Sequence, residues 1–170
     1  MKKFILTLCI LLTNVSVSLA VPVIPSVCFT PGGQCTERIV SAIASAKKSV
    51  WVQAYSFTST PIVKALIDAH QRKLDVRVVL DVSNQTAQYT AATFLMNAGV
   101  PVLIDKNHAI AHNKIMIIDG KSVFTGSFNF TQAAQERNAE NSLLVRGSVV
   151  ADYIKNFTVH ESHAVKYERK

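Results

Sequence analysis

Helix-like and strand-like segments alternate through the first two thirds of the chain, and this alternation constrains the fold most strongly. Apolar residues recur at helical spacing in three segments, and a short apolar run typical of a buried strand follows each of them. The pairs are residues 35–49 and 50–57, 59–73 and 75–81, and 86–99 and 100–105. This β-α-β rhythm predicts parallel strands with helices packed on the faces of their sheet.

The rhythm changes after Asp105. Residues 114–118 and 122–126 are β-rich runs joined by Asp119-Gly120, which is a common hairpin turn sequence. A last strand and a long closing helix are expected at residues 140–147 and 148–167. The predicted fold class is α/β, with a single domain built on a mixed, mostly parallel sheet that has helices on both faces.

The N-terminus has the pattern of a secretory signal peptide. Lys2 and Lys3 precede an apolar run, and Ser18-Leu19-Ala20 offers the small residues that a signal peptidase accepts. An uncleaved membrane anchor is the competing interpretation, but polar residues interrupt the run before it reaches the roughly 20 apolar residues of a spanning helix. We predict a signal peptide at residues 1–20, cleavage after Ala20, a mature domain at residues 21–170, and a periplasmic or secreted protein without stable membrane insertion.

Two cysteines, Cys28 and Cys35, remain in the predicted mature chain. In an oxidising compartment such a pair usually forms a disulfide, and the Pro-Gly-Gly between them can turn the chain back. Closing so short a loop would stabilise the domain by about 2–3 kcal/mol. Two free thiols in a loose segment are the alternative.

The chain is basic. Its 170 residues carry a formal charge of +7, and removal of Lys2 and Lys3 with the leader leaves 16 basic against 11 acidic residues, or +5. Such a surplus favours an anionic partner, either nucleic acid or an acidic lipid surface, although a solvated basic surface explains it equally well. Basic side chains that could flank a groove are Lys47, Lys48, Arg72, Lys73, Arg77 and Lys106.

One constellation of polar residues points to phosphate chemistry. His112 and Lys114 are two apart in a β-rich stretch, so their side chains should lie on the same face. Ser127 and Asn129 repeat this spacing after the hairpin, next to Gly126, which allows a close backbone approach. A lysine, a hydroxyl and an amide can hold the oxygens of a phosphate ester while an imidazole reacts, without a metal.

These intervals resemble the HKD motif of the phospholipase D superfamily. The matching pattern is His112-x-Lys114, Asp119 and Gly126-Ser127-x-Asn129, and residues 56–66 are also similar to a stretch found in small members. The resemblance extends over nearly all of the predicted mature chain. It implies a phosphodiesterase without cofactor or metal, in which one histidine forms a covalent phosphohistidine and a second histidine protonates the leaving oxygen.

A chain with one HKD motif supplies one such histidine. In single-motif members of the superfamily two copies meet across a two-fold axis, so the resemblance implies a homodimer in which His112 is nucleophile in one subunit and general acid in the other. It further implies that Lys114 and Asn129 bind phosphate oxygens with help from Ser127. Glu140 matches an acid that orients the histidine.

Asp119 belongs to the motif, and we include it among the candidate catalytic residues. A purely structural role in the Asp-Gly turn would explain it as well.

No metal site is expected. His108 and His112 have a spacing that suits metal binding on a helix, but the β-branched residues that follow indicate a strand, and Lys114 would repel a cation. His160 and His163 are expected on the solvated face of the closing helix.

Three functions are consistent with these residues. The first is a metal-independent, sequence-nonspecific endonuclease acting on single- and double-stranded DNA, with RNA as a further substrate; no base-reading motif is present, so contacts should be mainly to phosphate. The second is a phospholipase D or cardiolipin hydrolase acting on phospholipid phosphodiesters. The third is a catalytically idle nucleic-acid-binding protein, against which the complete motif argues.

Overall fold

Eight strands form one sheet in the computed structural model, which describes residues 26–85 and 90–168. The order across the sheet is β1-β7-β6-β5-β2-β3-β4-β8. The strands are β1 (Ser26–Thr30), β2 (Ser49–Ala54), β3 (Asp75–Asp81), β4 (Val102–Asp105), β5 (Lys114–Ile118), β6 (Ser122–Gly126), β7 (Glu140–Arg146) and β8 (Val165–Lys166).

The sheet is mixed, as predicted, but the expectation that it would be mostly parallel is wrong. Only β2–β3 and β3–β4 are parallel pairs among the described strands. The β-α-β rhythm covers this part alone, whereas β5, β6 and β7 form an antiparallel meander and β5 pairs antiparallel with β2. The edge strands β1 and β8, which the sequence pattern did not reveal, add two further antiparallel pairs.

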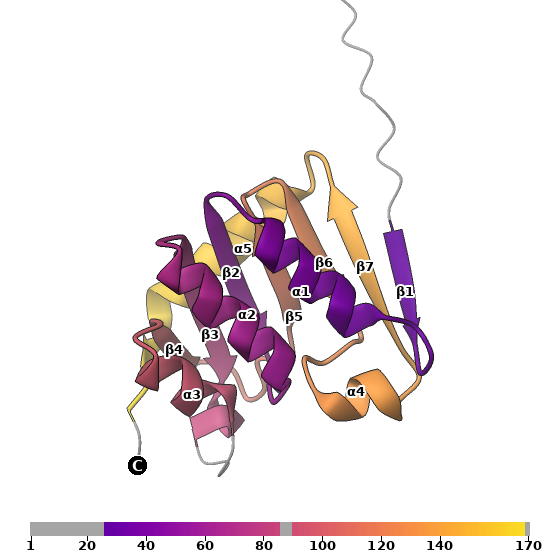
Figure 1. The fold of residues 1–170 in the computed structure, drawn as a ribbon. Coiled ribbons are helices and arrows are strands. Elements are labelled where there is room, and N and C mark those ends of the chain that lie inside the picture. The colour runs from indigo at the N-terminus through magenta and orange to yellow at the C-terminus, as the bar shows by residue number, and fades with distance from the viewer. Residues whose placement is uncertain (1–25, 86–89, 169–170) are drawn as a thin grey trace, which may run out of the picture.

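Helices cover both faces of the sheet (Figure 1). They are α1 (Cys35–Ser45), α2 (Thr60–Gln71), α3 (Ala91–Asn97), α4 (Gln132–Glu136) and α5 (Val150–His163), with a 3-10 turn at Val82–Gln85. The helices α1, α2 and α3 lie on the near face in Figure 1, and α5 crosses the far face. The larger hydrophobic core lies beneath the first three helices, and a smaller one lies beneath α5. In the smaller core the rings of Phe157 and Trp51 are stacked, with 5.3 Å between their centroids.

Boundaries shift where the sequence pattern is ambiguous. The helix predicted at residues 86–99 runs from Ala91 to Asn97 in the structure, with Thr90 as an extended N-cap, while residues 86–89 lie outside the described part of the chain. The closing helix was predicted to reach residue 167 but ends at His163, because the next residues pair with β4 as β8. His160 is buried against Asp105, with 2.7 Å between His160 Nδ1 and Asp105 Oδ2, so the expectation of a solvated face is wrong at this residue.

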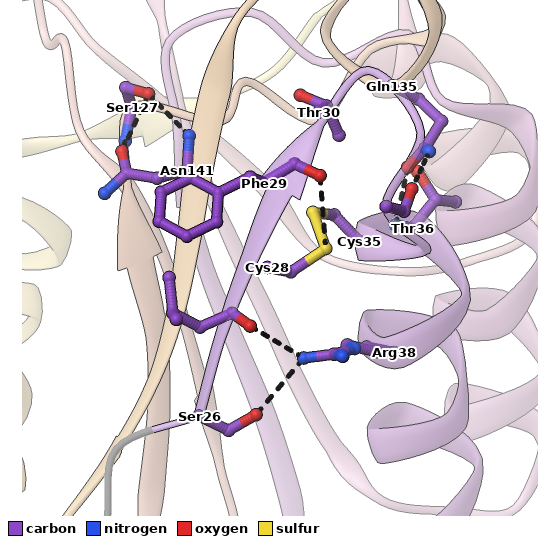
Figure 2. Close-up of a disulfide and its surroundings, with 12 residues drawn as sticks. Ser26, Cys28, Phe29, Thr30, Cys35, Thr36, Arg38, Ser127, Gln135 and Asn141 are labelled. Atoms are coloured by element: carbon purple, nitrogen blue, oxygen red, sulfur yellow. Dashed lines mark hydrogen bonds between the residues drawn. A yellow bond between two sulfur atoms is a disulfide. The ribbon is translucent and has the colours of Figure 1, made fainter.

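Cys28 and Cys35 form the predicted disulfide, which ties β1 to the first residue of α1 (Figure 2). The link holds the edge strand against the helix layer. The predicted signal peptide and its cleavage site lie outside the described residues. Within the described part, no helix is both long and apolar enough to span a membrane.

Candidate active site

Residues from four adjacent strands meet at one end of the sheet. Lys114 begins β5, Gly126 ends β6 and Glu140 begins β7, and these strands run antiparallel, so the three residues lie at the same end. Ala54, the last residue of β2, pairs with Lys114, which places Tyr55 there as well. The loops next to these strand ends carry three of the predicted site residues, which therefore gather at the same end of the sheet: His112, Ser127 and Asn129.

His112 is exposed, and its ring packs against Tyr55 with 4.6 Å between ring centroids. Its backbone carbonyl accepts a hydrogen bond from Lys114, but neither ring nitrogen bonds to another residue among those described. The chain at this point is held by Tyr55, whose backbone N–H donates to the carbonyl of Asn113 at 2.9 Å. The imidazole is thus held by its contact with the tilted Tyr55 ring, and neither ring nitrogen is engaged by a described residue.

Lys114 is the buried cation of this site, with only 7% of its surface exposed. Its Nζ donates to the His112 carbonyl at 2.7 Å and lies 5.1 Å from the centre of the Tyr55 ring. Burial lowers the pKa of Lys114, and the negative charge of Glu140 partly opposes this shift. A single internal hydrogen bond leaves two ammonium protons for a phosphate oxygen.

Ser127 is already hydrogen bonded within the chain. Its Oγ donates to Asn141 Oδ1 at 2.9 Å and accepts from the Asn141 backbone N–H at 3.0 Å (Figure 2). Gly126 makes this close approach of β6 and β7 feasible, as the sequence predicted. Its φ is +135°, and a Cβ there would lie 3.1 Å from the carbonyl carbon of Asn141 and still nearer its oxygen.

Asn129 and Glu140 are partly buried and make few hydrogen bonds with the described residues. Asn129 Oδ1 is buried and has no hydrogen-bond partner among the described residues, so the amide retains unused capacity. Glu140 accepts a hydrogen bond from Asn138 Nδ2 at 3.2 Å and interacts electrostatically with Lys114. Within the described chain it makes no hydrogen bond with His112.

Asp119 lies at the opposite end of β5. Its carboxylate accepts hydrogen bonds from the backbone N–H groups of Lys47, Lys48 and Ser49 at 2.7–3.1 Å, where the chain enters β2. Burial by itself raises the pKa of Asp119, but the backbone hydrogen bonds together lower it by more, so the net shift of the pKa is downward. The geometry gives Asp119 a structural role and separates it from the other motif residues.

Most of the basic residues singled out in the sequence lie away from this site. Arg72 donates to backbone carbonyls at the end of α1, and Arg77 pairs with Asp75 and Glu161. Lys47 and Lys48 flank Asp119 at the far end of the sheet. The guanidinium groups of Arg72 and Arg77 thus serve the fold, whereas Lys106 follows the end of β4, at the same end of the sheet as the candidate site.

Two residues of the site, Tyr55 and Asn141, were not predicted from the sequence. Tyr55 was assigned to a strand by its neighbours, and nothing in a strand pattern reveals that its ring supports both His112 and Lys114. Asn141, which holds Ser127, follows Glu140 directly; a polar Glu-Asn pair opening an otherwise apolar strand was the available signal.

The fold is a single α/β domain with the candidate site at one end of its sheet, and comparison with known proteins gives the family. Residues 39–160 match the family described as cardiolipin synthase, PLD-like domain. The crystal structure of Nuc from Salmonella typhimurium, a phospholipase D family member, superposes with a TM-score of 0.81 at 34% identity, covering 88% of this chain and all of Nuc. The chain belongs to the phospholipase D superfamily.

Curated relatives point to the same superfamily under other names. A protein named phospholipase D from Rickettsia bellii is 44% identical over 133 residues, which is 78% of this chain but 66% of the relative. A mitochondrial cardiolipin hydrolase from Xenopus laevis is 32% identical over 121 residues, 71% of this chain and 58% of the relative. The chain thus matches somewhat less than two thirds of the length of these relatives.

Proposed function

We propose that this protein is a metal-independent, sequence-nonspecific endonuclease that hydrolyses phosphodiester bonds of single- and double-stranded DNA, with RNA as a further substrate. The observation that carries the proposal is the pairing of an exposed imidazole, His112, whose ring nitrogens make no hydrogen bond with a described residue, and a buried ammonium that donates to its backbone carbonyl, Lys114. This pair supplies a nucleophile and a binding group for phosphate without a metal.

The proposed reaction has two displacements at phosphorus. In the first, a nitrogen of His112 forms a bond to phosphorus, the bond from phosphorus to the leaving oxygen breaks, and a second histidine gives that oxygen a proton. In the second, the same histidine takes a proton from water, the water oxygen bonds to phosphorus, and the phosphorus–nitrogen bond breaks. Both histidines return to their starting protonation states.

Lys114 and Asn129 are the proposed phosphate-binding groups. Lys114 retains unused protons, and the Nδ2 group of Asn129, which makes no hydrogen bond with a described residue, can donate to a phosphate oxygen. Ser127 must first turn its hydroxyl away from Asn141 before it can donate to a phosphate oxygen. We therefore assign Ser127 an assisting role.

Glu140 is proposed to act through charge. Its electrostatic interaction with Lys114 favours the ammonium that burial disfavours. Its predicted hydrogen bond to a histidine requires either a movement toward His112 or the histidine of a second subunit, because the isolated chain does not contain this contact.

A homodimer is proposed because the chemistry needs two histidines on opposite sides of phosphorus. The chain carries a single copy of the motif. A two-fold axis through the site would pair each His112 with its own copy, making one active site from two chains. The exposure of His112 is consistent with such a position near a subunit boundary.

The substrate choice rests on charge, on the similarity to Nuc and on the predicted secretion signal. The net charge of +5 without residues 1–20, from 16 basic and 11 acidic residues, suits a polyanion, and no base-reading element is apparent, so contacts to phosphate would dominate. With the leader removed after Ala20, the enzyme would act in the periplasm or outside the cell.

A phospholipid substrate is the second candidate, favoured by the names of the rickettsial phospholipases and the cardiolipin hydrolases among the relatives. The test is a comparison of plasmid nicking with hydrolysis of cardiolipin and phosphatidylcholine vesicles by the same preparation. The proposal predicts nucleic-acid cleavage with little lipid turnover. Lipid turnover with intact plasmid would replace the nuclease by a phospholipase that uses the same His112.

A further inference from the structure

Four potential metal ligands converge at the edge of the sheet where β4 ends. Asp105 is the last residue of β4, His108 follows in the next loop, and His160 and His163 lie in the last turn of α5. One ligand atom from each side chain can be chosen so that all four lie within 4.8 Å of one another. None of the four was assigned to a site from the sequence.

The three imidazoles surround a single carboxylate oxygen. Asp105 Oδ2 lies 3.0 Å from His108 Nδ1, 2.7 Å from His160 Nδ1 and 3.2 Å from His163 Nε2. A tetrahedral zinc ion with bonds of about 2.0–2.1 Å holds neighbouring ligand atoms about 3.3 Å apart. The three distances to Asp105 Oδ2 are close to this value, and the four ligand atoms, which lie within 4.8 Å of one another, would have to draw together around an ion.

Hydrogen bonding to Asp105 accounts for His108 and His160 but less well for His163. His108 Nδ1 lies 3.2 Å from Asp105 Oδ1 and 3.0 Å from Oδ2, and His160 Nδ1 lies 2.7 Å from Oδ2, so both of these imidazoles can hydrogen bond to the carboxylate. His163 Nε2 is buried and makes no hydrogen bond with any described residue, despite its short distance to the carboxylate. Against the effect of burial, this contact helps to lower the pKa of Asp105, and it leaves His163 Nε2 without an aligned hydrogen bond, so the nitrogen can serve as a metal ligand.

The surroundings also suit an ion. The backbone N–H of Asn107 donates to Asp105 Oδ1 at 3.0 Å, which fixes the carboxylate with Oδ2 toward the histidines. Asp105 is fully buried, while the side chain of His108 is 46% exposed, so an ion could reach the cluster from the His108 side.

We propose that Asp105, His108, His160 and His163 form a structural binding site for a divalent transition-metal cation, with zinc as the best match. Three nitrogens and one carboxylate oxygen are zinc ligands, and four protein ligands leave no open position for catalysis. The ion would fasten the end of α5 to the loop that carries His112 four residues after His108. The opposite part of this loop is held by Asp81 Oδ2, which accepts from the Ala111 N–H at 2.7 Å.

The test is a Co²⁺ titration of the purified, tag-free chain after dialysis against a chelator. The proposal predicts intense visible absorption typical of four-coordinate Co²⁺, saturating at about one ion per chain, and loss of these bands when Zn²⁺ is added. His108→Ala should abolish them, since its half-exposed side chain can be removed without opening the core. His163→Ala should do the same, and circular dichroism would show that both variants are folded.

Two further variants locate the ion. His70→Ala changes a histidine of α2 outside the cluster and His112→Ala removes the proposed nucleophile, and both should bind Co²⁺ as the unaltered chain does. Absence of four-coordinate bands in the unaltered protein would overturn the proposal. So would bands that persist in His108→Ala and His163→Ala or vanish in His112→Ala. Because no substrate is present, the result is independent of the proposed nuclease activity.

Discussion

Lys114 shows how a functional side chain works against stability. Its ammonium is buried at 7% exposure with one hydrogen bond, to a backbone carbonyl, and burial lowers its pKa. An uncharged residue of similar length would avoid this desolvation cost. Retaining a cation here therefore makes sense for binding an anion and not for folding.

Replacement of Lys114 separates these two effects. Lys114→Met should lower turnover by about 10²–10³ because a charge-stabilising donor is lost, while the free energy of unfolding is unchanged or increased. Steady-state nuclease rates and urea unfolding measure the two quantities. Lys64→Met, an exposed lysine on α2, is the matched control and should change neither. A Lys114→Met enzyme with full turnover would remove Lys114 from the phosphate site.

Asp119, unlike Lys114, contributes to stability, because its contacts join the end of β5 to the start of β2 and do not reach the site. It occupies a left-handed conformation, with φ of 55°, which asparagine tolerates and alanine does not. Asp119→Ala should destabilise the chain by about 2–4 kcal/mol through lost hydrogen bonds and backbone strain. Asp119→Asn should cost less. Both variants should keep near-normal activity while folded, and a specific loss of turnover would restore a catalytic role for Asp119.

The pKa of Asp119 also fixes the direction of a pH effect. Its folded-state pKa is lowered, so its charge contributes stability that is fully present above the unfolded value of about 3.9. This contribution is lost as the pH falls through the lower, folded-state pKa. The stability difference between the unaltered chain and Asp119→Asn should therefore shrink in acid, as chemical unfolding over a pH series would measure. A difference that grew in acid would contradict this account.

At the scale of elements, the Cys28–Cys35 disulfide secures an edge strand that has neighbours on one side only. β1 pairs with β7, and the disulfide fastens it to α1. Replacing both cysteines by serine should lower the free energy of unfolding by about 2–3 kcal/mol, the value for a short closed loop. Urea unfolding measures it, and adding reductant should destabilise the parent but not the double variant. Equal stability of the two proteins would mean that the link contributes nothing.

The elements that the sequence predicts well are those whose pattern is local. Helical spacing in residues 59–73 and the Asp-Gly turn at residue 119 correspond to α2 and the β5–β6 hairpin. β1 and β8 depend on distant partners: β8 is two residues long, and it exists because Val165 and Lys166 can pair with β4. Local periodicity carries no information about such pairing.

The residues of the site likewise fall into those that local spacing predicts and those that only the fold brings together. The spacings of His112 with Lys114 and of Ser127 with Asn129 were visible because strand geometry relates residues two apart. Tyr55 and the cluster of Asp105 with three histidines were not, because they bring together segments more than 50 residues apart. Only the sheet order and the position of α5 make these contacts.

For the whole molecule, the decisive question is whether one chain or two make the active site. If two subunits share the active site, a chain that lacks His112 should inactivate the dimer that it forms with an unaltered chain. Unfolding and refolding the unaltered protein with about a tenfold excess of His112→Ala should leave about a tenth of the active chains in homodimers, with activity reduced in proportion. An excess of His70→Ala should not inhibit. Activity that is unaffected by excess His112→Ala would show that each chain acts alone.

The measurement that tests the central claim most directly is cleavage of supercoiled plasmid by the purified protein in excess EDTA, beside His112→Ala. Circular dichroism in the same buffer would show that both proteins remain folded after any bound ion is removed. The account predicts nicking and linearisation that persist in EDTA and fall about a thousandfold or more in the variant. Activity that stops in EDTA while the protein stays folded, or that survives loss of His112, would contradict a metal-independent phosphohistidine mechanism.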